Sequence, residues 1–141
     1  MPRIRKSDPA ERHERIRRQN ATEIAEDYVE VIDDLIAANG EARVMELARH
    51  FGVSHVTVIR TLKRLQEQDL VEKHANRYIR LSDSGQQMAT RSRERHELVI
   101  QFLRSIGVSS DQAAADAEGI EHHVSRETLS AMRKHLGKRS E

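Results

Sequence analysis

Cysteine and tryptophan are both absent from the 141 residues of this chain. Without thiols the chain cannot form disulfide scaffolds, thiolate zinc sites or iron–sulfur clusters. Aromatic residues make up only 3%, which disfavours the stacking platforms that bind single-stranded nucleic acids. Two prolines and six glycines indicate a mostly helical chain.

Long apolar runs are also missing. None approaches the roughly 20 residues that are needed to span a bilayer. Residues 1–18 lack the apolar centre of a secretory signal peptide. We therefore expect a soluble cytoplasmic protein that has no membrane partner.

The net charge of +1 lacks the basic excess that is typical of a nucleic-acid-binding protein. The charges are unevenly distributed, however. Residues 1–22 carry a net +4, residues 23–41 a net −7 and residues 42–80 a net +4, while residues 81–141 are balanced. The near-neutral total therefore arises because the charges of these regions cancel. Two basic regions that flank one acidic helix indicate that the basic and the acidic regions have different partners.

Apolar spacing predicts the helices, with Ser54, Ser82 and Ser109 as the expected caps of three of them. An alternating pattern predicts a hairpin. The first 21 residues have little to bury, so we expect a flexible or partly helical basic arm. Helices are predicted over 22–39, 42–50, 55–68 and 83–106, from 110 onward, and from 126 to a stop at Gly137; the hairpin pairs 70–73 with 78–81.

Residues 42–81 follow the order helix, tight turn, helix and hairpin, which is typical of a winged helix-turn-helix. The major groove admits one helix whose polar face meets base edges. Ser54 and Thr57 lie at a helix N-terminus, which favours a phosphate, and Arg60 is a candidate for a guanine edge. The candidate DNA-binding residues are Ser54, His55, Val56, Thr57, Arg60, Lys63, Arg64 and, at the hairpin tip, Arg77.

A helical domain with a solvated basic face is the alternative to DNA binding for this segment. The spacing of Ala48, Gly52 and Val58, the hairpin and the local charge of +4 favour DNA binding. The sequence therefore predicts a mainly α protein with a winged helix-turn-helix DNA-binding domain over residues 22–82.

Carboxylates and imidazoles occur at helical spacing in three segments, so that members of a segment share one helix face. Such hard donors hold one or two divalent ions, and without cysteine they suit Mn(II), although affinity alone favours Zn(II) or Cu(II). The candidate ligands are Asp27, Glu30, His96, Glu118, Glu121 and His122.

Each of these segments is also compatible with a solvated helix face, a surface turn or a structural histidine. His123 follows His122 by about 100° on a helix and is expected to point away. Glu26, Asp33 and Asp34 are expected to be ordinary solvated acids.

Four segments in a fixed order resemble the diphtheria-toxin-repressor family, specifically its manganese transport regulator branch. They are Asp27-x-x-Glu30, the winged helix-turn-helix, Arg95-His96-Glu97 and Glu118-Gly119-Ile120-Glu121-His122-His123. The resemblance implies a metal-activated homodimeric repressor, with a helical metal-binding and dimerisation domain over residues 83–141. It also implies that the six candidate ligands bind two Mn(II) ions per subunit, and that the partner is a palindromic double-stranded DNA operator of manganese transport or homeostasis genes.

The iron-responsive branch of that family has a methionine at the position that matches Asp27 and a cysteine at the one that matches Glu118. Oxygen donors at both positions favour manganese here. The N-terminal arm is longer than in the shortest members. Its charge either adds phosphate contacts or serves a solubilising tail, and the sequence leaves both open.

Four other functions are alternatives to this interpretation of the sequence. An Fe(II)-responsive repressor of the same fold and a winged-helix regulator that senses an organic ligand stay open, although no small organic ligand is expected. A dinuclear metallohydrolase is disfavoured, because this sequence contains neither a nucleophile motif nor a phosphate-cradling glycine loop. No enzymatic activity is therefore expected. A metal buffer leaves residues 54–80 unexplained.

Overall fold

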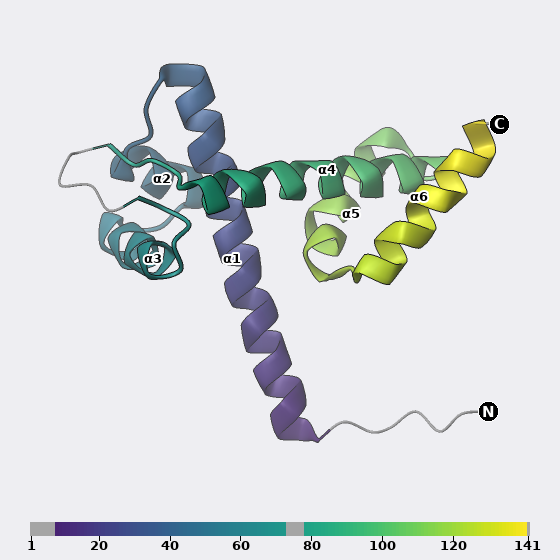
Figure 1. Cartoon of the computed structure of the whole chain (residues 1–141), viewed down its shortest axis with the longest axis horizontal. Coiled ribbons are helices and arrows are strands. Elements are labelled where there is room, and N and C mark those ends of the chain that lie inside the picture. The colour runs from purple at the N-terminus through teal and green to yellow at the C-terminus, as the bar shows by residue number, and fades with distance from the viewer. Residues whose placement is uncertain (1–7, 73–77, 141) are drawn as a thin grey trace.

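The computed structural model describes residues 8–72 and 78–140. Within these ranges the chain is built from helices joined by short connections (Figure 1), which confirms the mainly α fold class. No described helix combines the length and the apolar character needed to cross a bilayer. The elements are α1 (Pro9–Asn39), α2 (Val44–Phe51), α3 (His55–Glu67), α4 (Asp83–Ser105), α5 (Ser110–Ile120), the 3₁₀ turn η1 (Glu121–His123) and α6 (Arg126–Ser140).

The first helix begins much earlier than Thr22, where the apolar pattern placed its start. It begins at Pro9, and the carboxylate of Asp8 caps it by accepting a hydrogen bond from the Ala10 N–H at 3.3 Å. The prediction was wrong because residues 8–22 carry no apolar stripe; they are exposed apart from the partly buried Gln19. In Figure 1 this part of α1 extends away from the body of the protein as a single helix.

A first hydrophobic core lies where α1, α2 and α3 meet. Ile32 of α1, Leu47 of α2 and Val58 of α3 are fully buried in it. The ring of Tyr28 stacks on that of Phe51, with 4.3 Å between the ring centroids. The apolar stripes predicted for the second and third helices therefore face this core, and the acidic helix is fixed to the helix-turn-helix.

The turn between α2 and α3 follows the predicted chemistry. Gly52 ends α2 in the left-handed region with φ of 65°, and Ser54 caps α3 by accepting a hydrogen bond from the Thr57 N–H at 3.2 Å. Helix α2 begins at Val44 rather than at Ala42, because Ala42 forms an antiparallel bridge with Ile79.

The segments on either side of the predicted hairpin turn are paired antiparallel. Val71 bridges to Leu81, and the Glu72 N–H donates a hydrogen bond to the Arg80 carbonyl at 2.8 Å. In the described part of the chain this pairing consists of isolated bridges. The predicted turn at 74–77, which includes Arg77, lies outside the described residues.

Helix α4 crosses α1 and joins the first core to a second one (Figure 1). Ala89 near its start is buried in the first core, whereas Val99 is buried in the second core with residues of α5 and α6. Ser82 caps α4, and Ser109 caps α5, as predicted. Helix α6 continues past Gly137, where we expected it to stop, because Gly137 has no positive φ.

Ion pairs fasten α4 to the acidic face of α1. Arg93 of α4 pairs with both Asp33 and Asp34, which we expected to be ordinary solvated acids. The side chain of Asp33 is 18% exposed, whereas that of Asp34 is 69% exposed. The crossing of the two helices therefore involves paired charges beside the apolar core.

Candidate metal centre

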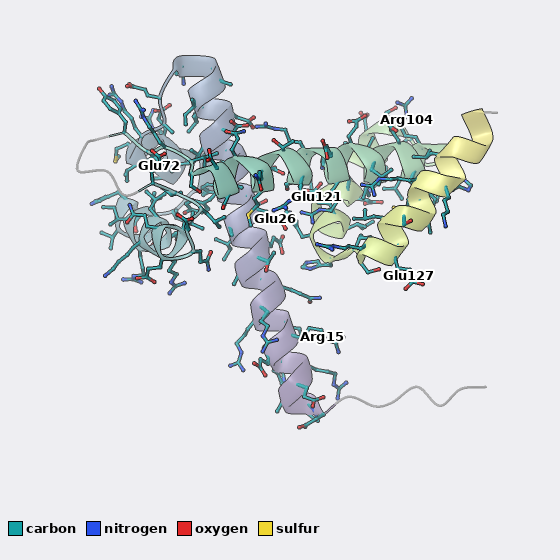
Figure 2. The ribbon with its side chains drawn as sticks, viewed as in Figure 1. Arg15, Glu26, Glu72, Arg104, Glu121 and Glu127 are labelled. Carbon is teal, nitrogen blue, oxygen red and sulfur yellow. The ribbon has the colours of Figure 1, made fainter. Side chains whose placement is uncertain are left out.

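The six predicted metal ligands come from three parts of the fold that meet beside the crossing of α1 and α4. Figure 2 labels Glu121 in this region. The end of α5 and the turn η1 bring their side chains against α1, which no local sequence pattern predicts. Asp27 and Glu30 lie on α1, His96 on α4, Glu118 on α5, and Glu121 and His122 in η1.

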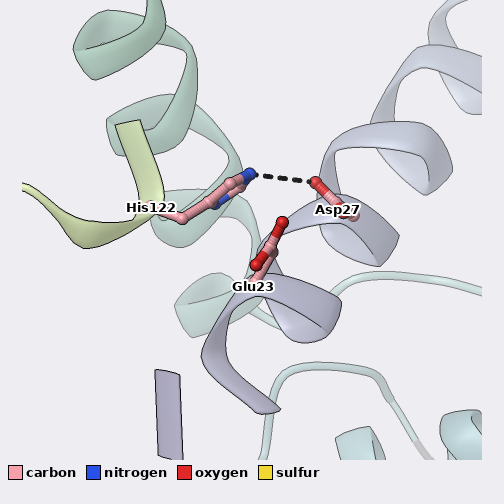
Figure 3. Close-up of side chains that lie close together, drawn as sticks. All are labelled: Glu23, Asp27 and His122. Carbon is pink, nitrogen blue, oxygen red and sulfur yellow. Dashed lines mark ion pairs between the residues drawn. The ribbon is translucent and has the colours of Figure 1, made fainter. Parts of the chain in front are cut away.

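The carboxylate of Glu121 lies between two imidazoles. Its Oε2 is 2.5 Å from Nδ1 of His96, and its Oε1 is 3.4 Å from Nε2 of His122. The same Nε2 atom is 3.3 Å from Oδ1 of Asp27 (Figure 3). Glu121 is only 1% exposed. Four of the six predicted ligands are thus joined by direct contacts around one buried carboxylate.

The other two predicted ligands lie beside this group. Oε1 of Glu118 is 4.0 Å from Nε2 of His96, and Oε1 of Glu30 is buried without a hydrogen-bond partner. Glu30, His96 and Glu118 line a cavity of about 260 Å³. A buried carboxylate oxygen without a partner is costly, and a cation in this cavity removes that cost. The donor set, with carboxylate oxygens and imidazole nitrogens, therefore fits a hard divalent cation.

Glu23 is a candidate that the sequence analysis missed. One oxygen of Glu23, one of Asp27 and a ring nitrogen of His122 all lie within 4.8 Å of one another (Figure 3). Oε2 of Glu23 is also 3.4 Å from Nε2 of His123. The i, i+4 spacing of Glu23 and Asp27 on one helix is the signal that points to it.

Glu26 is not the solvated acid that we expected. Its exposed fraction is 5%, its Oε2 is 2.8 Å from Nδ1 of His122, and it forms an ion pair with Arg95 of α4. The expectation was wrong because both partners are far away in the sequence. The carboxylate of Glu26 therefore belongs to the surroundings of the metal centre.

Packing these acids together changes their proton affinities. Burial raises the pKa of Asp27, the charge of His122 opposes the rise, and the charge of Glu23 adds to it. Burial also raises the pKa of Glu121 against the opposing charge of His96. Burial lowers the pKa of His122, but its hydrogen bond to Glu26 and the charge of Asp27 outweigh that effect and leave the pKa raised. Without a cation, Asp27, Glu121 and His122 therefore hold their protons to higher pH than the free side chains do.

Metal affinity is consequently expected to depend on pH. Because the pKa values of Asp27, Glu121 and His122 are all raised, protons compete with a cation at higher pH than they do at the free side chains. We expect Mn(II) affinity to decrease as the pH is lowered from about 8 to about 6, with protons released on binding. Calorimetric titrations in two buffers of different ionisation enthalpy measure both quantities. An affinity that does not change with pH contradicts this expectation.

The second candidate site is the outer side of α3. Ser54, Val56, Thr57 and Arg60 are exposed, as are the other predicted DNA-binding residues His55, Lys63 and Arg64. The Ser54 hydroxyl oxygen already accepts the Thr57 N–H, so its observed role is to cap the helix. Ile59, which the sequence analysis did not select, is 53% exposed. The assignment of these residues to DNA stays a prediction.

Two family models match consecutive parts of the chain. The model described as the iron-dependent repressor, metal-binding and dimerisation domain matches residues 82–141, and the MarR family model matches residues 34–78. The first match contains four of the predicted metal ligands, and the second contains the helix-turn-helix.

The most informative relative is the transcriptional regulator MntR of Escherichia coli O157:H7. It is 44% identical over 130 residues, which cover 92% of this chain and 84% of the relative. A manganese-dependent transcriptional repressor solved in complex with manganese is 32% identical, with a TM-score of 0.67 over 80% of this chain and 52% of that one. IdeR of T. acidophilum is 27% identical, with a TM-score of 0.66 over 79% of this chain and 53% of that one. This chain spans about half the length of those two solved structures.

Proposed function

Because the chain belongs to the MntR family of transcriptional regulators, we propose that it is a Mn(II)-activated homodimeric repressor. The resemblance found in the sequence is thereby confirmed, and the protein is a transcriptional regulator rather than an enzyme. We further propose two Mn(II) ions per subunit, palindromic operators of manganese transport and homeostasis genes as targets, and action in the cytoplasm. The relatives support this proposal through their names and through the matched metal-binding and dimerisation domain.

The observation that carries the proposal is the position of Glu121 between two imidazoles, opposite the acids of α1. Asp27 lies on α1, the helix that packs in the first core, whereas Glu121 and His122 follow α5. A bound divalent cation would offset the negative charge of these carboxylates. With the cation held, Asp27 and Glu30 of α1 would be attracted to the same ion as the ligands from α4 and η1 instead of being repelled by Glu121. The metal ligands therefore control how firmly the helix-turn-helix is held against the rest of the subunit.

This coupling gives the metal a route to DNA. Helix α1 shares its core with α2 and α3, so restricting α1 also restricts the proposed reading helix. In a dimer, two such helices read successive major grooves only when their separation is fixed. Dimerisation is assigned to residues 83–141, DNA binding to residues 22–82 and the arm to residues 1–21. The residues proposed to contact DNA are Ser54, His55, Val56, Thr57, Arg60, Lys63, Arg64 and Arg77.

An Fe(II)-responsive repressor is the second candidate, because the matched C-terminal domain model is described as that of an iron-dependent repressor. Oxygen donors at Asp27 and Glu118 favour Mn(II), since neither position offers a sulfur ligand. A cavity of about 830 Å³ in the described part of the chain is lined mainly by polar and charged side chains, among them Glu41, Arg43 and Arg49. Such a lining does not favour a regulator that senses an organic ligand, because sites for such ligands are predominantly apolar.

The test is DNA binding as a function of metal. Genomic fragments are enriched on the Mn(II)-loaded protein, and a recovered duplex is used as the labelled probe. We expect this duplex to bind about tenfold to a hundredfold more tightly with Mn(II) than with chelator, a coupling of typical size. Titrations with Fe(II) and Zn(II) rank the metals, and sedimentation of the same samples reports the dimer. Equal affinity with Mn(II) and with chelator contradicts the proposal.

A further inference from the structure

We propose that Glu26 is a positioning residue of the metal centre, which orients the imidazole of His122 through its far nitrogen. This inference rests on the proposed function, because it takes His122 to bind the cation through Nε2. It goes beyond the ligand set, since Glu26 is not one of the six ligands. Its basis is a three-element contact that joins α1, α4 and η1 behind the site.

The two ring nitrogens of His122 face different groups. Nδ1 lies 2.8 Å from Oε2 of Glu26, which is not one of the predicted ligands. Nε2 lies 3.3 Å from Oδ1 of Asp27 and 3.4 Å from Oε1 of Glu121. The imidazole is buried, so it cannot satisfy Nδ1 with water. Glu26 is therefore the group that determines which edge of the ring faces the site.

A neutral imidazole carries one N–H donor and one lone pair, and the partner of one nitrogen sets the role of the other. When Nδ1–H donates to the carboxylate of Glu26, Nε2 keeps its lone pair for a cation. The negative charge on Glu26 also makes Nε2 a stronger donor to a metal. Such outer-shell carboxylates typically change metal affinity about tenfold to a hundredfold.

Arg95 holds Glu26 in this orientation. Its guanidinium pairs with the same Oε2 atom that faces His122, and it comes from α4, so it contacts the carboxylate from another element. A carboxylate that is only 5% exposed needs a cationic partner to be retained as a charge. Arg95 provides it, and it lies next to the ligand His96 in the sequence. The ligand His96 on α4 and the orientation of the ligand His122 in η1 are thus connected through Arg95 and Glu26.

Glu26→Ala is the first test, with two readouts on the full chain. We expect Mn(II) affinity, measured by calorimetry, to fall about tenfold to a hundredfold. With Zn(II) as a diamagnetic substitute, the Nδ1-bound proton of His122 is expected in the nitrogen-15 spectrum of the parent protein and is expected to be lost in the variant. The comparison is made on folded protein, because unfolding alone also removes this proton signal.

Glu26→Gln keeps the side-chain volume and an acceptor oxygen but removes the charge. It is expected to recover part of the affinity and to shift the Nδ1–H signal toward that of a weaker hydrogen bond. This variant decides the question if Glu26→Ala does not fold. Asp33→Asn is the matched control, because it removes another charged contact between α1 and α4, and its Mn(II) affinity is expected to stay unchanged.

The outcomes separate the two proposals. Failure of the parent protein to bind Mn(II) overturns the proposed function. Normal Mn(II) binding by the parent, together with unchanged affinity and an unchanged Nδ1–H signal in both Glu26 variants, overturns the positioning role while the proposed function stands. An equal loss of affinity in Asp33→Asn also overturns it, because the effect then comes from loosening the helix crossing.

Discussion

Glu121→Gln is expected to lower Mn(II) affinity more than a hundredfold, beyond the tenfold to hundredfold typical of an outer-shell residue. Glu121 is the only predicted ligand whose two oxygens contact two different imidazoles within the described residues, Oε2 with His96 and Oε1 with His122. A glutamine fills the same space but offers one neutral oxygen. Calorimetric titration with Mn(II) measures the loss, and DNA binding of the variant is expected to become independent of metal.

The same substitution is expected to leave the metal-free protein at least as stable as the parent. Burial raises the pKa of Glu121, so its folded-state pKa lies above the unfolded value. Such a carboxyl favours folding below its unfolded pKa, and that contribution is lost as the pH rises through the folded pKa. The ionised form of Glu121 therefore opposes folding, and glutamine removes the ionisable group. Urea unfolding in chelator measures this effect.

Opposite signs for metal affinity and stability distinguish this prediction from simple damage to the fold. Glu127→Gln on the exposed side of α6 is the matched control (Figure 2), and it is expected to change neither quantity. A Glu121→Gln protein that binds Mn(II) as tightly as the parent removes Glu121 from the site. A strongly destabilised metal-free variant shows that the buried charge is compensated without metal.

Gly85→Ala is expected to destabilise the fold by about 3 kcal/mol or more, at the upper end of the range for overpacking. A Cβ atom on Gly85 would lie 2.0 Å from the carbonyl oxygen of Leu70. That oxygen cannot easily move, because it accepts a hydrogen bond from the Ser82 N–H at 3.1 Å beside the start of α4. The start of α4 and the segment after α3 must separate to admit one methyl group.

Thermal and urea unfolding measure this loss, and a decrease of about 10 °C in the melting temperature corresponds to it. Gly137→Ala is the control, since a Cβ there meets nothing within 4 Å and α6 continues through this residue. Alanine is the better helix former by up to about 1 kcal/mol, so the control is expected to be neutral or stabilising. Equal stability of the two variants contradicts the close packing at Gly85.

Local chemistry was enough to predict much of the fold. Ser54, Ser82 and Ser109 each cap the helix that was expected to follow them, because a cap depends only on residues within one turn. The apolar stripes of α2 and α3 face the first core for the same local reason. The start of α1 was misplaced because an exposed helix leaves no apolar period to detect.

The sequence by itself determined which side chains share a helix face and which metal donors are available. Asp27 and Glu30 lie on one face by spacing, and the absence of cysteine restricts the ligands to oxygen and nitrogen. The resemblance to a known family, which implied all six metal ligands, also came from the sequence. None of these inferences required knowledge of how one helix packs against another.

Only the tertiary structure decided the surroundings of those donors. Glu26 meets Arg95 and His122, which are 69 and 96 residues further along the chain, so no local period connects them. The position of Glu121 between His96 and His122 likewise depends on how α4 crosses α1 and where η1 follows α5. Spacing along a helix determines which face of that helix a side chain lies on, whereas the burial of a side chain and its partners depend on how the helices pack against one another. That difference made Glu26 look solvated in the sequence although it lies behind the metal centre.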